Sequence, residues 1–251
     1  MCKPIASVSL LAALIAGCGG KSNSVPPPPS TAQIQGKWSG VATSSTGATA
    51  TADADLQQAG SSVFSTAGNN TQINGRCATP SDSMSGQITG NSVAIIVTEG
   101  GQHVNLNGTV SADGQSMSGT YTSDAGGCTQ GDTGTWTASK IASVSGTYSG
   151  TVNSDVRPQP IPVGVSGSLA EDAQWNLTAA LQVTNSVCFS SLNLFGGTAG
   201  RLVILLDSAS TIQIGGSAVD NAAHTINVFY QTTSGPCAGD HGHGTLTRSG
   251  P

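Results

Sequence analysis

Metal-binding side chains gather at one place in the sequence, the stretch CAGDHGHG near the C-terminus. It contains Asp240, His241 and His243. Residues two apart on a β-strand point to the same side, so the two imidazoles could share Zn²⁺ or Cu²⁺, with the carboxylate as a further ligand. The corresponding positions of an internal repeat hold Gln130, Gly131 and Thr133. A glycine-rich turn that tolerates polar residues is the favoured interpretation of the stretch. We therefore expect no metal site, for which Asp240, His241 and His243 are only weak candidates.

Signatures of catalysis are missing from the sequence. No G-x-S-x-G stretch occurs, which excludes the nucleophile elbow of the α/β-hydrolases. Glutamate occurs only at Glu99 and Glu171, and both positions resemble turns. His103 and His224 are isolated from other candidate catalytic residues. We therefore expect no enzymatic activity and no cofactor, and a hydrolase is the least favoured alternative.

The cysteines offer a second kind of chemistry. Cys18 follows an apolar stretch, residues 5–16, which is preceded by one positive charge at Lys3. A stretch of 12 residues is too short for a transmembrane helix, which needs about 20 residues. Its length matches the apolar core of a secretory signal, and small residues follow it, as at a signal cleavage site.

The residues Leu14-Ile15-Ala16-Gly17-Cys18 resemble the lipobox of bacterial lipoprotein precursors. The resemblance implies cleavage before Cys18, a diacylglycerol on its thiol and an acyl chain such as palmitate on the new amino group. Two or three acyl chains make a durable membrane anchor, whereas one binds only marginally. Residues 1–17 are then a lipoprotein signal peptide, with an ordinary signal peptide or a buried helix as the alternative.

A linker separates the expected anchor from the rest of the chain. Residues 18–33 comprise Cys18 and a segment rich in Pro, Ser and Gly, in which Pro26 to Pro29 are consecutive. Polyproline is extended and fairly stiff, at about 3.1 Å per residue, so it holds a folded domain away from the lipid surface. Gly19 stands where an inner-membrane retention signal resembling that of enterobacteria has Asp. We expect a bacterial envelope protein whose partner is the outer membrane, through the lipid anchor.

The amino-acid composition limits which other classes of partner are expected. Loss of Lys3 with the signal leaves seven of the eight Lys and Arg residues against 13 Asp and Glu, a formal charge near −6. This charge disfavours nucleic acid as a partner. Charged residues make up 8% of the chain, against about 25% in ordinary domains, so Ser, Thr, Asn and Gln must keep the surface soluble. Protein partners are not predicted.

The sequence repeats itself once. Motifs and single residues recur in the same order at a spacing near 110 residues. The pairs are GKWSG from Gly36 with GTYSG from Gly146, Cys77 with Cys188, Tyr121 with Tyr230, Cys128 with Cys237, and GTWTAS from Gly134 with GTLTRS from Gly244. We therefore predict two homologous units, residues 34–140 and 141–251.

Four cysteines remain once Cys2 is cleaved away and Cys18 is lipidated. Four cysteines allow three pairings, and export places them where disulfides persist. Each unit has one cysteine near its middle and one before its last strand, and a unit that folded before the duplication would have paired its own two. We predict the disulfides Cys77–Cys128 and Cys188–Cys237, and a link between the units would contradict the two-domain organisation.

Each unit has the pattern of short β-strands. VNLNGTVSADGQSMSGTYTS alternates on both sides of Asp113-Gly114, which predicts a hairpin with a type I′ turn. No segment has a helical period, and Gly and Ser disfavour helices. We predict an all-β protein of two tandem antiparallel meanders, each with about seven to nine strands.

The opening G-x-W motif followed by a meander resembles the lipocalin and avidin superfamily of small β-barrels. The resemblance implies a barrel in which the first strand closes on the last; a β-sandwich is the alternative. Aromatic residues at repeat-equivalent positions then fill the barrel interior rather than form a platform for stacking ligands. They are Trp38, Trp136, Tyr121, Tyr148 and Tyr230.

These observations favour a lipid-anchored envelope protein with a role in binding or surface structure. The expected ligand is a small apolar or carbohydrate-like molecule inside a barrel or at its open end. A carbohydrate-recognising or adhesive β-module is the alternative, and it would carry its aromatic residues on an exposed face.

Overall fold

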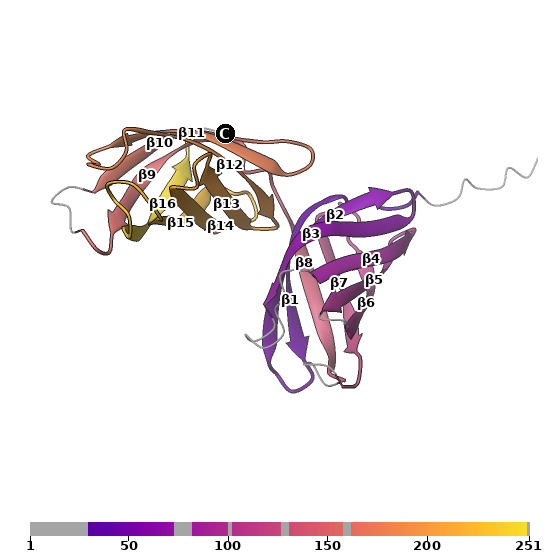
Figure 1. Cartoon of the computed structure of the whole chain (residues 1–251). Helices are drawn as coiled ribbons and strands as arrows, with labels where there is room; N and C mark the ends of the chain where they lie inside the picture. The colour runs from indigo at the N-terminus through magenta and orange to yellow at the C-terminus, as the bar shows by residue number, and fades with distance from the viewer. Residues whose placement is uncertain (1–29, 73–81, 100–101, 127–130, 158–161, 250–251) are drawn as a thin grey trace, which may run out of the picture.

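The computed structural model describes residues 30–72, 82–99, 102–126, 131–157 and 162–249, and its regular elements are all β-strands (Figure 1). Within these ranges, no helix is long and apolar enough to cross a membrane. The strands are β1 (Gly36–Ser44), β2 (Thr49–Ala59), β3 (Ser62–Gln72), β4 (Asp82–Thr89), β5 (Ser92–Glu99), β6 (Gln102–Val110), β7 (Ser116–Ser123), β8 (Thr133–Ile141), β9 (Gly146–Ser154), β10 (Val163–Glu171), β11 (Asn176–Thr184), β12 (Ser191–Ala199), β13 (Leu202–Asp207), β14 (Ile212–Ala218), β15 (Thr225–Thr232) and β16 (His241–Arg248).

The strands form two closed antiparallel barrels. Strands β1 to β8 follow one another around the first barrel, and β8 pairs back onto β1. Strands β9 to β16 do the same in the second barrel, where β16 pairs with β9. The prediction of two all-β meanders with barrel-like closure is confirmed, and the sandwich alternative is wrong. The first barrel includes Ile141, one residue beyond its predicted boundary.

Alternating side chains build both interiors. In β11, for example, Leu177, Ala179 and Leu181 are buried and the residues between them are exposed. This period of two is what a strand requires when one face meets a core and the other meets water. The two barrels have separate hydrophobic cores: the first contains two tryptophans, Trp38 and Trp136, and the second is mainly aliphatic.

The predicted hairpin around Asp113-Gly114 joins β6 and β7, but its turn is not type I′. Only Gly114 of this pair has a positive φ, +69°. The closing bond runs from Ser111 N to Ser116 O, at 2.8 Å, so the loop is longer than two residues. Within it, the Asp113 carboxylate accepts hydrogen bonds from Ser111 Oγ and Gln115 N, and these local bonds favour the longer loop.

One end of each barrel is closed by a residue that precedes the first strand. Ile34 is fully buried, and its carbonyl accepts a hydrogen bond from Trp38 Nε1 at 2.7 Å. Val144, also fully buried, lies four residues before Tyr148, as Ile34 lies four before Trp38. The Tyr148 hydroxyl donates to the Ala223 carbonyl at 2.8 Å. We call this the plugged end of each barrel.

A cation lies over each of these rings, and it shows how the last strand of the first barrel, β8, aligns with the last strand of the second, β16. Lys140 Nζ lies 5.7 Å from the centre of the Trp38 ring, and the Arg248 guanidinium lies 5.5 Å from that of Tyr148. Each cation is also the strand partner of its aromatic residue. Strands β8 and β16 therefore correspond at a spacing of 248 less 140, or 108, not the predicted 110. Trp136 then corresponds to Gly244 rather than Leu246.

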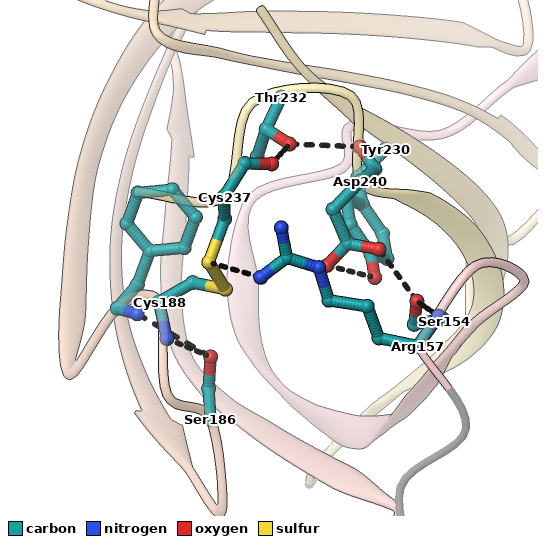
Figure 2. The surroundings of a disulfide bond; sticks show 9 residues. Ser154, Arg157, Ser186, Cys188, Tyr230, Thr232, Cys237 and Asp240 are labelled. Carbon is teal, nitrogen blue, oxygen red and sulfur yellow. Dashed lines mark hydrogen bonds between the residues drawn. A yellow bond between two sulfur atoms is a disulfide. The ribbon is translucent and has the colours of Figure 1, made fainter. Parts of the chain in front are cut away.

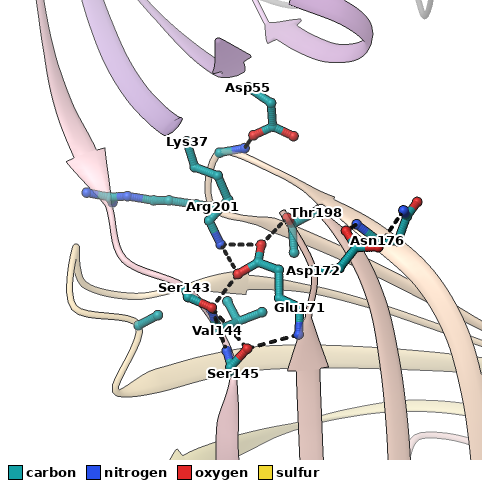
Figure 3. A network of polar contacts seen from close by, with 12 residues as sticks. Lys37, Asp55, Ser143, Val144, Ser145, Glu171, Asp172, Asn176, Thr198 and Arg201 are labelled. Atoms are coloured by element: carbon teal, nitrogen blue, oxygen red, sulfur yellow. Dashed lines mark hydrogen bonds and ion pairs between the residues drawn. The ribbon is translucent and has the colours of Figure 1, made fainter. Parts of the chain in front are cut away.

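The barrels contact each other where the β12–β13 hairpin of the second meets β1 and β2 of the first (Figure 3). At the hairpin tip, Gly200 has φ +55°, and its N–H donates to Asp55 Oδ1 at 2.9 Å. The N–H of Arg201 donates to Asp53 Oδ1 at 3.1 Å. Burial raises the pKa of Asp55 to about 6 and also raises the pKa of Asp53.

A buried ion pair lies beside this hairpin. Lys37 Nζ is 2.7 Å from Glu171 Oε1, and both side chains are 3% exposed. Glu171 also accepts hydrogen bonds from Val144 N and Thr198 Oγ1 (Figure 3). Burial alone would raise its pKa, but the hydrogen bonds from Lys37 and Thr198 and the charge of Lys37 hold it below the ordinary value. The prediction that Glu171 lies in a turn is wrong: it is the last residue of β10, and it joins the barrels.

Candidate functional site

Each barrel encloses an apolar cavity that extends toward the end opposite the plugged one. The cavity volumes are about 120 Å³ in the first barrel and about 80 Å³ in the second. The first is lined by residues that include Ala42, Ala54, Leu56, Ile95, Leu106, Tyr121, Asp132, Trp136 and Ala138. The second is lined by residues that include Ser154, Val165, Leu181, Val183, Leu205, Ile214, Val228, Tyr230 and Asp240.

The volumes limit what these cavities can hold. An apolar cavity of about 150 Å³ stays dry and takes up benzene. Cavities of about 120 and 80 Å³ therefore suit molecules of only a few non-hydrogen atoms, or the end of a longer chain that leaves through the open end. Their apolar walls, mainly aliphatic in the second barrel and partly aromatic in the first, provide contact area without directional bonds.

A polar cluster interrupts the apolar wall of the first cavity. Asp132, which precedes β8, accepts hydrogen bonds from Ser44 Oγ at 2.7 Å and from the Tyr121 hydroxyl at 2.6 Å. The N–H of Thr133 donates to the same carboxylate at 2.8 Å. Three donors from three parts of the barrel therefore converge on one carboxylate at the end of the cavity.

The second barrel repeats the cluster (Figure 2). Asp240, which is 6% exposed and precedes β16, accepts a hydrogen bond from Ser154 Oγ at 2.5 Å. The Tyr230 hydroxyl points at its other oxygen from 3.5 Å. The last residue of the first strand, a tyrosine of the seventh strand and an aspartate before the eighth thus recur in both copies.

The backbone of each aspartate is held in the same way. Asp132 O accepts from the N–H and the hydroxyl of Ser123, and Asp240 O accepts from the N–H and the hydroxyl of Thr232. Asp132 and Asp240 are 108 residues apart, the spacing of the strands that follow them. The aspartate is therefore part of the shared scaffold, contrary to the sequence alignment, which had paired Asp240 with Gln130.

Ionisation of the two clusters follows from burial and hydrogen bonding. Burial, and then the hydrogen bond to Asp132, raises the pKa of Tyr121 to about 12. Burial alone would raise the pKa of Asp132, but its hydrogen-bond donors outweigh it and leave the pKa below the ordinary value. Burial also raises the pKa of Tyr230. At neutral pH each cluster therefore contains a neutral phenol, and in the first this phenol donates to an ionised Asp132.

A disulfide lies at the open end of the second barrel. Cys188 and Cys237 are bonded, with Cα atoms 5.8 Å apart and a separation of 49 residues, which confirms this predicted link. Residues 186–189, on the loop between β11 and β12, line the cavity. The Arg157 guanidinium donates to Cys237 Sγ at 3.4 Å (Figure 2). The predicted link between Cys77 and Cys128, and Cys18 itself, lie outside the described residues.

The proposed metal candidates do not converge. His241 and His243 lie on the exposed face of β16, as the two-residue spacing predicted. Asp240 is buried and lines the cavity instead. His243 Nδ1 is 3.1 Å from Asp155 Oδ1, and His241 Nδ1 lies 3.2 Å from Gly239 O. Within the described ranges, no three His, Cys, Asp or Glu side chains come together as metal ligands.

The aromatic residues at repeat-equivalent positions face the barrel interiors, as predicted. Trp38, Trp136, Tyr121 and Tyr148 are all buried. Tyr230 is partly buried and lines the second cavity. Phe195 and Phe229 are exposed on the outside of the second barrel, but the Phe229 ring lies against Gly215, where an added Cβ would meet it.

Comparison with models of known protein families gave no match to this chain. Comparison with curated protein sequences gave no match either.

Proposed function

We propose that this protein is a lipid-anchored protein of the bacterial cell envelope whose barrels bind small apolar molecules. The observation that carries the proposal is the pair of internal cavities, each apolar along its walls and polar at an aspartate near one end. Ligand sites in proteins are commonly concave and apolar, with a few fixed polar groups. The outer membrane remains the proposed location, on the sequence resemblances alone.

The inward-facing aromatic side chains support binding inside the barrels over a carbohydrate-recognising surface. Such a surface stacks sugar rings on exposed aromatic faces, whereas both tryptophans of the first core are buried.

Binding is also favoured over hydrolysis by the chemistry of the clusters. Ser44 and Ser154 donate directly to carboxylates. Neither has a histidine partner within the described residues, and histidine is the base that activates the nucleophile in Ser–His sites.

Ligand binding is tested with benzene, a compact apolar probe of six carbon atoms that is larger than the closed part of either cavity and would extend toward the open end. Titration of the purified full-length chain, followed by methyl NMR, should shift signals of Leu106 in the first barrel and Ile214 in the second. For six carbon atoms we expect a dissociation constant of about 1 mM or tighter.

Two variants that fill the cavities make this test specific. Ala138→Leu gives the first barrel the side chain that Leu246 supplies in the second, and Val165→Phe fills the second cavity. Each variant should lose benzene binding in its own barrel and retain it in the other. Unchanged methyl signals in the original protein at 10-fold excess benzene over the expected dissociation constant, about 10 mM, would remove the basis of the proposal.

The anchor is tested separately in bacteria. Cys18→Ser should abolish labelling by a fatty-acid analogue and move the protein from the membrane to the soluble fraction. Labelling of Cys237→Ser should match that of the unaltered protein. Unchanged membrane association of Cys18→Ser would contradict the lipoprotein proposal.

A further inference from the structure

The two aspartate clusters differ in how completely the carboxylate is satisfied. Both oxygens of Asp132 accept short hydrogen bonds, Oδ1 from Ser44 and Thr133 and Oδ2 from Tyr121. Asp240 has one short bond, from Ser154 to Oδ1, and Tyr230 stands 3.5 Å from Oδ2. A carboxylate offers about four acceptor sites, so Asp240 retains acceptor capacity that Asp132 has used.

The acceptor capacity that Asp240 retains lies among apolar side chains. Asp240 is 6% exposed and lines the second cavity together with valine, leucine and isoleucine side chains. A buried acceptor without a full set of donors costs free energy. A ligand in this cavity that brings a donor to Asp240 Oδ2 would recover that loss, and a purely hydrocarbon ligand would not.

The groups around Asp240 select the kind of donor. Arg157 lies in the same open end, with its guanidinium on Cys237 (Figure 2). A cationic ligand group would therefore enter beside a positive charge, and a carboxylate would face the negative Asp240. A neutral hydroxyl avoids both conflicts, because it can donate to Asp240 and accept from the Tyr230 hydroxyl.

We infer that the second barrel binds small apolar alcohols or phenols, with the ligand hydroxyl placed between Tyr230 and Asp240. The inference rests on the proposed function, that the cavities take up apolar molecules. The first barrel binds without this preference, because both oxygens of Asp132 already accept short hydrogen bonds. The duplication has thus produced one cavity that recognises a hydroxyl group and one that recognises only apolar shape.

A pair of isomers tests this directly. Pentan-1-ol and 1-methoxybutane have the same atoms, but only the alcohol can donate a hydrogen bond. Titrations of the full-length chain are followed through the methyl signals of Ile214 in the second barrel and Leu106 in the first. We expect the alcohol to bind the second barrel about tenfold more tightly than the ether, as one hydrogen bond to a charged acceptor implies, and the first barrel to bind both equally.

Variants assign the preference to the aspartate. Asp240→Ala should abolish the preference of the second barrel while keeping ether binding, and Asp132→Ala should change nothing in the second barrel. The isomer comparison in the unaltered protein stands even if Asp240→Ala does not fold. Equal binding of the isomers in the second barrel would overturn the inference and leave the proposed function intact. Failure of both isomers and of benzene to bind would overturn both.

Discussion

Single hydroxyl groups distinguish the two copies. The Tyr121 hydroxyl is 2.6 Å from Asp132 and the Tyr230 hydroxyl is 3.5 Å from Asp240, although both tyrosines occupy the same place on the seventh strand. Each ring also packs against a glycine of the next strand, Gly134 or Gly242. The rings are therefore positioned alike, and the two copies differ in the distance from the tyrosine hydroxyl to the aspartate.

Removal of these hydroxyls should have unequal effects on stability. Tyr121→Phe takes a short bond from a partly buried carboxylate and should lower the free energy of unfolding of the first barrel by about 1.5–3 kcal/mol, as for a hydrogen bond to a charged group. Tyr230→Phe should lower that of the second by less than about 1 kcal/mol, because its bond is already long. Urea unfolding of both variants measures this. A larger loss in Tyr230→Phe would show that Asp240 depends on this hydroxyl more than the geometry indicates.

The sequence predicted the residue types of the site better than their roles. It singled out Asp240 together with His241 and His243 as a weak cluster, but strand alternation sends the carboxylate inward and the imidazoles outward. It missed Asp132, because the last strand was aligned on the similar motifs GTWTAS and GTLTRS, two residues from the true register. The spacing of the aspartate to the cation that covers the first aromatic, eight residues in both copies, was the signal that could have found it.

At the scale of elements, the loops at the open end of the second barrel shape the candidate site more than the strands do. The disulfide Cys188–Cys237 ties the loop between β11 and β12 to the loop between β15 and β16. Both loops lie beside the second cavity, and Asp240 follows Cys237 by three residues. The link therefore fixes the two loops at the open end of the second barrel, beside the cavity.

Loss of this disulfide should destabilise the second barrel selectively. In the chain-entropy model, a link across 49 residues contributes roughly 4 kcal/mol. The double variant Cys188→Ala/Cys237→Ala should lose about that amount in the second barrel and little in the first. Urea unfolding read from the backbone amide signals of each barrel measures the two separately. Equal losses in both barrels would mean that they unfold as one unit.

The strand pattern itself was predictable, since alternation and Gly-containing turns are local properties. Eight strands per unit and closure of the first strand on the last agree with the sequence. Turn type was not predictable at Asp113-Gly114, because side-chain bonds within the loop decided it. The position of Glu171 was not predictable either, because its burial depends on Lys37, 134 residues away on the other barrel.

At the scale of the whole molecule, the junction between the barrels carries opposing charges. Lys37 and Glu171 form a buried pair, while Asp53 and Asp55 accept backbone hydrogen bonds from the β12–β13 hairpin. Burial raises the pKa of Asp55 to about 6, from an ordinary value of 3.8. Because the folded state favours the protonated form, the contribution of Asp55 to stability is complete below pH 3.8 and is lost as the pH rises through about 6.

Replacement of this carboxyl by its amide should therefore stabilise the molecule at neutral and higher pH. Asp55→Asn keeps an oxygen for the Gly200 N–H and removes the charge. We expect a gain in the free energy of unfolding of roughly 1–3 kcal/mol at about pH 7.5, which shrinks as the pH falls toward about 4.5. Thermal unfolding across this range measures the difference, with the exposed Asp124→Asn as the control. A less stable Asp55→Asn at the higher pH would show that the charge strengthens the junction.

The plugged end of the first barrel has a mechanical consequence. The chain from the N-terminus enters the barrel through residues 30–35, where Ala32 N bonds to Gly90 O and the Gln58 side chain bonds to both Ala32 and Ile34. Any tension along the N-terminal segment is therefore carried first by the residue that closes the core. Shear that extracts Ile34 would unseat Trp38 Nε1 as well. In a protein tethered by its N-terminus, a pull on that tether would therefore open the first barrel before it reached the second, which follows it along the chain.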